Sequence, residues 1–128
     1  MKNHSRNLPQ IVTHILQKAF FKHALVQKGR YMYSILIVDD EPIVKIALRS
    51  ILPWEEHGFS ICGTASNGLE ALPLIEQHHP DVIITDLKMP GMDGLELIRT
   101  LKEKNCPGEI LVLSNYEDFD SVRSALLL

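Results

Sequence analysis

The chain has 128 residues, of which 45% are apolar and 23% are charged, and its formal net charge is −3. This length suits one domain with a hydrophobic core of its own, so no disulfide or metal is needed for stability. The composition excludes a wholly disordered chain, and no apolar run reaches the roughly 18 residues of a membrane span. Cys62 and Cys106 lie far apart, which is typical of reduced thiols and predicts a cytoplasmic protein.

The charge divides the chain into two parts. Residues 1–31 carry six lysines and arginines and no acidic residue, whereas residues 32–128 hold the other seven basic residues and all sixteen acidic ones. Apolar residues recur at helical spacing between Leu8 and Lys28, which predicts a basic amphipathic extension over 1–31. This extension is either foreign to the domain, with Met32 as the true start, or a helix that binds a membrane or a partner.

The second part begins with two predicted strands and a helix between them. A continuous aliphatic run at 35–38 predicts a strand buried on both faces. Pro42 suits the first turn of the helix that follows. Alternation of apolar with polar or small residues over 59–65 predicts a strand nearer the edge of a sheet. Trp54 and its neighbours up to His57 are expected in a loop between the helix and this strand.

Two further helices flank a third strand. Apolar spacing from Leu69 to Ile75 predicts a helix, in which Pro73 predicts a kink or a late start. Val82-Ile83-Ile84 predicts another buried strand. Asp93, followed three residues later by Glu96, is typical of a helix N-cap with a capping box.

A fourth strand at 110–113 and the start of a fourth helix at 119–126 complete the pattern. Regular alternation of strands and helices predicts a parallel sheet with helices on both faces. The fold class is therefore α/β, a doubly wound sheet.

Acidic side chains follow two of these strands. Asp39 and Asp40 come directly after the first strand, Asp86 follows the third, and Ser114 follows the fourth. Because ligands bind at the carboxyl ends of the strands in such sheets, we expect these side chains to share one site. Close carboxylates repel one another, and a hard cation such as Mg²⁺ removes that conflict. A carboxylate beside Mg²⁺ is suited to attack phosphorus.

Each of these residues also has a purely structural interpretation. Asp39 and Asp40 could instead be acidic residues at the start of a helix, where the helix dipole stabilises a negative charge. Asp86 is a residue type that caps loops, and Ser114 one that caps helices. The ordered set of all four favours the functional interpretation over these separate ones.

Three stretches together resemble the receiver domain of two-component response regulators. The stretches are Val38-Asp39-Asp40-Glu41-Pro42, Ile84-Thr85-Asp86-Leu87-Lys88-Met89-Pro90-Gly91-Met92-Asp93-Gly94, and Leu113-Ser114. Residues 114–119 further resemble receivers joined to AraC-type helix-turn-helix output domains. The resemblance implies a flavodoxin-like fold and a phosphoryl group received from a histidine kinase to control transcription.

The resemblance also implies a role for each matching residue. Asp86 would be the phosphoacceptor, and Ser114 would hydrogen-bond the phosphoryl group. Asp40 would be the direct Mg²⁺ ligand, with Asp39 acting nearby, Asp86 as a further ligand and the backbone carbonyl of Lys88 completing the protein's share. The domain itself would not be a metabolic enzyme.

The family has five strand–helix units, and this sequence supplies four. Strand order 2-1-3-4 is therefore expected, with the fifth strand and fifth helix missing, so that residues 32–128 form an incomplete receiver. The chain is then a fragment of a longer regulator that binds DNA through an output domain absent here. The resemblance leaves a homodimer of the longer protein open.

Other functions are disfavoured by the same residues. Phosphohydrolases with an aspartyl nucleophile carry a second Asp two residues after the first, whereas Asp39 and Asp40 are adjacent. A flavin module of similar fold needs a phosphate loop rich in Ser, Thr and Gly after the first strand, where Asp39-Asp40-Glu41-Pro42 would repel the phosphate. The alternative left open is a phosphorylation-independent interaction module or a non-functional fragment.

Overall fold

The structure is a computed structural model that describes residues 32–51 and 53–113. Its elements follow in the order β1 (Tyr33–Val38), α2 (Pro42–Ile51), the 3₁₀ helix η1 (Trp54–His57), β2 (Phe59–Ala65), α3 (Gly68–His78), β3 (Val82–Asp86), α4 (Gly94–Glu103) and β4 (Glu109–Leu113). The predicted extension at 1–31, the start of a fourth helix at 119–126 and Ser114 lie outside the described residues.

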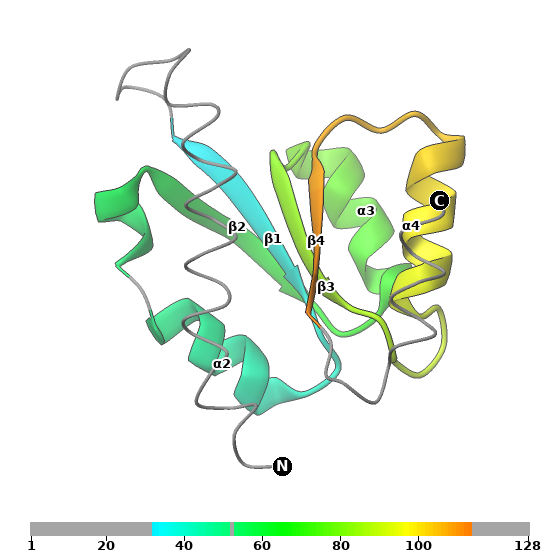
Figure 1. Ribbon diagram of the computed structural model, residues 1–128, viewed down its shortest axis with the longest axis horizontal. Coiled ribbons are helices and arrows are strands. Elements are labelled where there is room, and N and C mark those ends of the chain that lie inside the picture. Colours follow the sequence, from blue (N-terminus) through cyan, green and yellow to red (C-terminus); the bar gives the residue numbers. More distant parts are fainter. Residues whose placement is uncertain (1–31, 52, 114–128) are drawn as a thin grey trace.

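The four strands form one sheet in the order β2-β1-β3-β4 (Figure 1). All three pairings are parallel, so the carboxyl ends of the strands lie along the same edge. This arrangement confirms the predicted α/β fold, a flavodoxin-like doubly wound sheet of order 2-1-3-4.

Each face of the sheet carries its own apolar cluster. Ile35 and Ile37 of β1 pack with Leu48 of α2 on one face. Leu36 and Val38, which point the other way, pack against α3 and α4. Figure 1 shows α3 and α4 together on one side of the sheet and α2 on the other. Both faces of β1 are thus covered, as its uninterrupted aliphatic run predicts.

A bulge interrupts the simple alternation predicted for β2. The register with β1 shifts between Ile35 and Leu36, so that Cys62 is left without a partner in the ladder. Phe59 therefore packs in the cluster of the α2 face, while Ala65 packs in that of the α3 and α4 face. After an extra residue in a strand, each later side chain points to the opposite face of the sheet from the one that simple alternation predicts.

Two local predictions are corrected by the structure. Trp54 does not lie in a loop but opens η1, and it is 6% exposed. Its indole N–H donates to the carbonyl of Leu48 at 2.8 Å, and its ring meets Phe59 edge-on. The late helix start expected at Pro73 is also wrong, because α3 begins at Gly68 and runs through the proline. The side-chain cap of Asn67, which accepts from the N–H of Glu70, fixes that earlier start.

The capping box predicted for the next helix is confirmed. Asp93 accepts a hydrogen bond from the N–H of Glu96 at 2.9 Å, and the Glu96 side chain accepts from the N–H of Asp93 at 3.1 Å. The loop between β3 and α4 therefore ends at a well-defined helix start. Among the described helices, none has the length and apolar character needed to cross a membrane.

Candidate functional site

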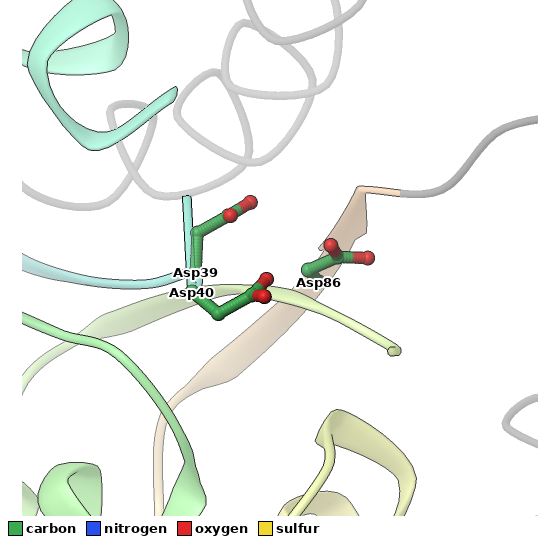
Figure 2. A group of neighbouring side chains, drawn as sticks. All are labelled: Asp39, Asp40 and Asp86. Carbon is green, nitrogen blue, oxygen red and sulfur yellow. The ribbon is translucent and has the colours of Figure 1, made fainter. Parts of the chain in front are cut away.

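The predicted acidic cluster forms at the carboxyl edge of the sheet. Asp39 and Asp40 directly follow β1, and Asp86 is the last residue of β3. Because β1 and β3 pair in parallel, with Val38 opposite Thr85, these residues are brought to one place. One carboxylate oxygen from each of the three lies within 4.8 Å of the others. Figure 2 shows Asp39 and Asp40 on one side of the site and Asp86 on the other.

Asp39 is the most buried member of the cluster, with 4% of its surface exposed. Burial raises the pKa of its carboxyl from 3.8 to about 6, and the negative charges of Asp86, Asp40 and Glu41 add to that rise. A hydrogen bond from the N–H of Glu41 to Asp39 Oδ1, at 2.9 Å, opposes it. The site therefore holds a carboxylate that is unfavourable without a nearby cation.

Asp86 is half-buried, and its backbone carbonyl and its carboxylate each accept a hydrogen bond. The hydroxyl of Thr85, which is fully buried, donates to the carbonyl of Asp86 at 2.8 Å. The N–H of Lys88 donates to Asp86 Oδ1 at 3.4 Å. One hydrogen bond thus holds the carbonyl of Asp86 and another its carboxylate, which lies at the sheet edge.

Two glycines that sequence reasoning did not assign fix the loop after Asp86. The N–H of Gly94 donates to the carbonyl of Leu87, and the N–H of Gly68 donates to the carbonyl of Met92. A Cβ placed on Gly94 would lie 2.0 Å from the carbonyl oxygen of Asp86. Only a glycine permits this close approach. The Met-Asp-Gly sequence was the available signal, although it does not reveal the distance.

Lys45 also reaches this edge, and no sequence pattern predicted its role. Its Nζ donates to Ser66 Oγ at 2.6 Å, joining α2 to the turn after β2. The N–H of Ser66 in turn donates to the Glu70 side chain at 3.0 Å. Asp39 is tied to the same turn, because its N–H donates to the carbonyl of Ala65. These contacts fix the position of the acidic cluster relative to β2.

The donor set fits a hard divalent cation. The cluster consists of three aspartates without a histidine or cysteine, and all-oxygen donors are those that Mg²⁺ prefers. Two side chains come from the end of β1 and one from the end of its neighbour β3. Lys88, whose carbonyl was predicted as a further ligand, lies two residues after Asp86 and is exposed. Ser114 lies outside the described residues.

The chain belongs to the response regulator receiver domain family, whose sequence profile matches residues 35–128. The transcriptional regulatory protein HptR of Staphylococcus aureus is 37% identical over 95 residues, which make up 74% of this chain and 37% of that protein. This chain therefore spans little more than a third of the length of such a relative.

Solved structures agree with this assignment. The receiver domain of AraT, a response regulator from Geobacillus stearothermophilus, is 34% identical with a TM-score of 0.70 and covers 75% of this chain and 74% of its own. The CheX–CheY–BeF₃–Mg²⁺ complex from Borrelia burgdorferi is 27% identical with a TM-score of 0.66, covering 76% and 72%. The chain is thus the receiver domain of a response regulator, and receivers are in general signalling modules.

Proposed function

We propose that this receiver takes a phosphoryl group from a histidine kinase onto Asp86, with Mg²⁺ bound by Asp39, Asp40, Asp86 and the backbone carbonyl of Lys88. The observation that carries this proposal is the convergence of the three carboxylates within 4.8 Å. The Mg²⁺ named in the Borrelia burgdorferi complex supports the choice of metal. Asp40 would ligate the metal directly, and Asp39 would act partly through water.

The chemistry follows from the position of Asp86. One of its carboxylate oxygens attacks the phosphorus of the phosphohistidine, a P–O bond forms and the P–N bond breaks. The histidine leaves with the electron pair and takes up a proton from solvent. When bound, Mg²⁺ neutralises the oxygens of the phosphoryl group in transfer. The hydrogen bonds at Thr85 and Lys88 hold Asp86 in place during the attack.

Ser114 would donate a hydrogen bond to the new phosphoryl group and carry the change to the rest of the domain. The downstream effect we propose is control of transcription through a DNA-binding output domain, as the name of the Staphylococcus aureus relative suggests. The longer protein would act in the cytoplasm. Its active form could be a homodimer. The domain does not act as a metabolic enzyme in this scheme.

The test is incubation of the full 128-residue chain with acetyl phosphate and Mg²⁺, followed by intact mass measurement. We expect one phosphoryl group to be added, and Asp86→Asn to abolish the addition. Asp93→Asn is the matched control, because Asn caps a helix as well as Asp does and Asp93 lies in the same loop. It should leave phosphorylation unchanged.

Labelling of the Asp86→Asn variant at the wild-type level would refute the assignment of the acceptor. Absence of labelling in a folded wild-type chain that binds Mg²⁺ would favour the phosphorylation-independent interaction module instead. Folding is checked independently through the fluorescence of Trp54, which lies in the α2-face cluster near the start of β2. This tryptophan sits at the opposite end of the strand from the aspartates, so it reports folding and not Mg²⁺ binding.

A further inference from the structure

The three aspartates of the site lie just beyond the part of the sheet in which β1 and β3 pair. The ladder between these strands ends at Val38 and Thr85, and the chain reaches Asp39, Asp40 and Asp86 only after those positions. Pairing of β1 with β3 therefore does not by itself fix the distance between the two adjacent aspartates and Asp86. Contacts from other elements contribute to that distance, and a metal binds tightly only where its ligands are held in place by such contacts.

The turn between β2 and α3, residues 65–68, contacts the backbone on both sides of the acidic cluster. On one side, the carbonyl of Ala65 accepts a hydrogen bond from the N–H of Asp39 at 2.9 Å. On the other side, the N–H of Gly68 donates to the carbonyl of Met92, in the loop between β3 and α4, at 2.8 Å. A Cβ placed on Gly68 would lie 2.5 Å from Met92 Cγ, so turn and loop are in close contact. We call residues 65–68 the bridging turn.

A lysine of α2 holds the bridging turn at Ser66. Lys45 Nζ donates to Ser66 Oγ at 2.6 Å, and both residues are half-buried. Glu41 lies four residues before Lys45, a spacing at which opposite charges can pair on a helix, yet the ammonium donates to the serine. Helix α2 lies on the opposite side of the sheet from α3 (Figure 1). The hydrogen bond therefore joins α2 to the turn that leads to the other face.

We propose that Lys45 is a positioning residue for Mg²⁺ binding: through Ser66 it holds the bridging turn, and the turn holds Asp39 and the loop after Asp86 at the spacing that the ion requires. This role rests on the proposed function, because it assumes that the acidic cluster binds Mg²⁺. Lys45 acts through the turn and not by contact with the ion, since its ammonium donates to a serine hydroxyl and not to a carboxylate of the cluster.

The charge of Lys45 and its position predict opposite effects when the lysine is removed. A positive charge near a metal site repels the metal, so loss of the charge alone would raise the affinity for Mg²⁺. Loss of a positioning contact lets the ligands move relative to one another and lowers the affinity. Removal of a residue that orients metal ligands typically weakens binding about 10- to 100-fold. The direction of the change therefore distinguishes the two effects.

The experiment measures the Kd for Mg²⁺ of the full 128-residue chain by titration calorimetry. Lys45→Met keeps much of the aliphatic stem and removes the donor, and we expect the Kd to rise about tenfold. Ser66→Ala should raise the Kd to a similar extent, and the double variant should show no further rise, because both changes break the same hydrogen bond. Ser66→Thr keeps the hydroxyl and should bind Mg²⁺ as the wild type does.

Arg49→Met is the matched control, because it removes a positive charge from an exposed residue one turn later on α2. It should leave the Kd unchanged or lower it slightly. A Lys45→Met variant that binds Mg²⁺ as tightly as the wild type, or more tightly, would overturn the positioning role and leave the proposed function intact. A folded wild-type chain that does not bind Mg²⁺ would refute the proposed metal site, and the positioning role with it.

Amide hydrogen exchange in the metal-free chain gives a second readout, which does not depend on the ion. The N–H groups of Asp39 and Gly68, which join the bridging turn to its two neighbours, should exchange faster in Lys45→Met than in the wild type. The N–H of Glu109 donates to the carbonyl of Asp81 at the other end of the sheet, and its exchange should not change. Equal acceleration at all three amides would show a general loss of stability and would overturn the positioning role.

Discussion

The two ends of the sheet differ in how the surroundings of an aspartate favour or disfavour its negative charge. At the amino end, Asp81 Oδ2 accepts hydrogen bonds from the N–H and the hydroxyl of Ser34, at 2.9 and 3.4 Å. At the carboxyl end, Asp39 is 4% exposed and faces two further carboxylates, and its pKa is raised to about 6. Asp81 accepts hydrogen bonds from Ser34, whereas the carboxylate of Asp39 has one hydrogen bond, from the N–H of Glu41, and two neighbouring carboxylates that repel its charge.

This difference indicates that the amino end of the sheet stabilises the fold, whereas the carboxyl end destabilises it in the absence of metal. The amino end also carries the aromatic contacts of Trp54 with Phe59 and of Phe59 with Tyr33. A charge held without its partner is unfavourable, so the carboxyl end lowers the free energy of unfolding in the absence of metal. Changes at the amino end should therefore affect stability without affecting Mg²⁺ binding, and changes at the carboxyl end should affect both.

The largest expected effect is at the amino end. Trp54→Ala removes a buried ring and its hydrogen bond to Leu48, and should lower the free energy of unfolding by about 3–5 kcal/mol. Urea unfolding followed by circular dichroism measures the loss. The milder Trp54→Phe keeps most of the buried volume, and Mg²⁺ affinity measured calorimetrically on it should equal that of the wild type. A fall in Mg²⁺ affinity in that folded variant would show that the two ends are coupled.

The next effect concerns the loop after Asp86. Gly94→Ala places a methyl group against the carbonyl oxygen of Asp86, and should destabilise the protein by about 1–3 kcal/mol and slow phosphorylation of Asp86. Gly63→Ala is the control, because its new methyl group would meet Leu36 at an ordinary 3.5 Å. Thermal unfolding and the acetyl phosphate reaction check both variants. Equal losses in the two would mean that the close approach at Gly94 has no special importance.

A smaller effect of opposite sign is expected at Asp39. A carboxyl whose pKa is raised on folding binds more protons in the folded state, so the contribution of Asp39 to stability without metal is most favourable at low pH and becomes less favourable as pH rises from about 4 to about 6. Asp39→Asn removes this dependence. After screening by solvent, it should gain about 1 kcal/mol at pH 7. Unfolding measured against pH with EDTA present tests the gain.

Mg²⁺ should reverse the result at Asp39. Added metal should stabilise the wild type by binding the folded state, and it should stabilise Asp39→Asn less. The matched change Asp81→Asn at the amino end should weaken the fold at neutral pH and leave the response to Mg²⁺ intact. A stability gain from Asp39→Asn that does not grow between pH 4 and pH 6 without metal would contradict this account of the acidic cluster.

Much of the site could be predicted because it depends on strand ends. The aliphatic runs of β1 and β3 fix where these strands stop, and parallel pairing then brings Asp39, Asp40 and Asp86 to one edge. The bulge at Cys62 could not be predicted, since it arises from the register between two strands and not from either sequence alone. The contact between Gly94 and Asp86 depends likewise on how α4 packs against the end of β3.

The smallest effect is expected at Glu96, an acidic residue whose charge, unlike that of Asp39, should be favourable where it lies. Glu96 lies in the first turn of α4, where its side chain accepts from the N–H of Asp93. A negative charge at a helix start is favourable, so Glu96→Ala should destabilise the protein by about 0.5 kcal/mol at low salt. Thermal unfolding in dilute buffer and in 1 M salt (roughly a 3 Å screening length) should show the loss shrinking as salt rises. A stabilising effect of Glu96→Ala would mean that repulsion from the acidic cluster extends along the loop to α4, and that the unfavourable charge is not confined to the three aspartates.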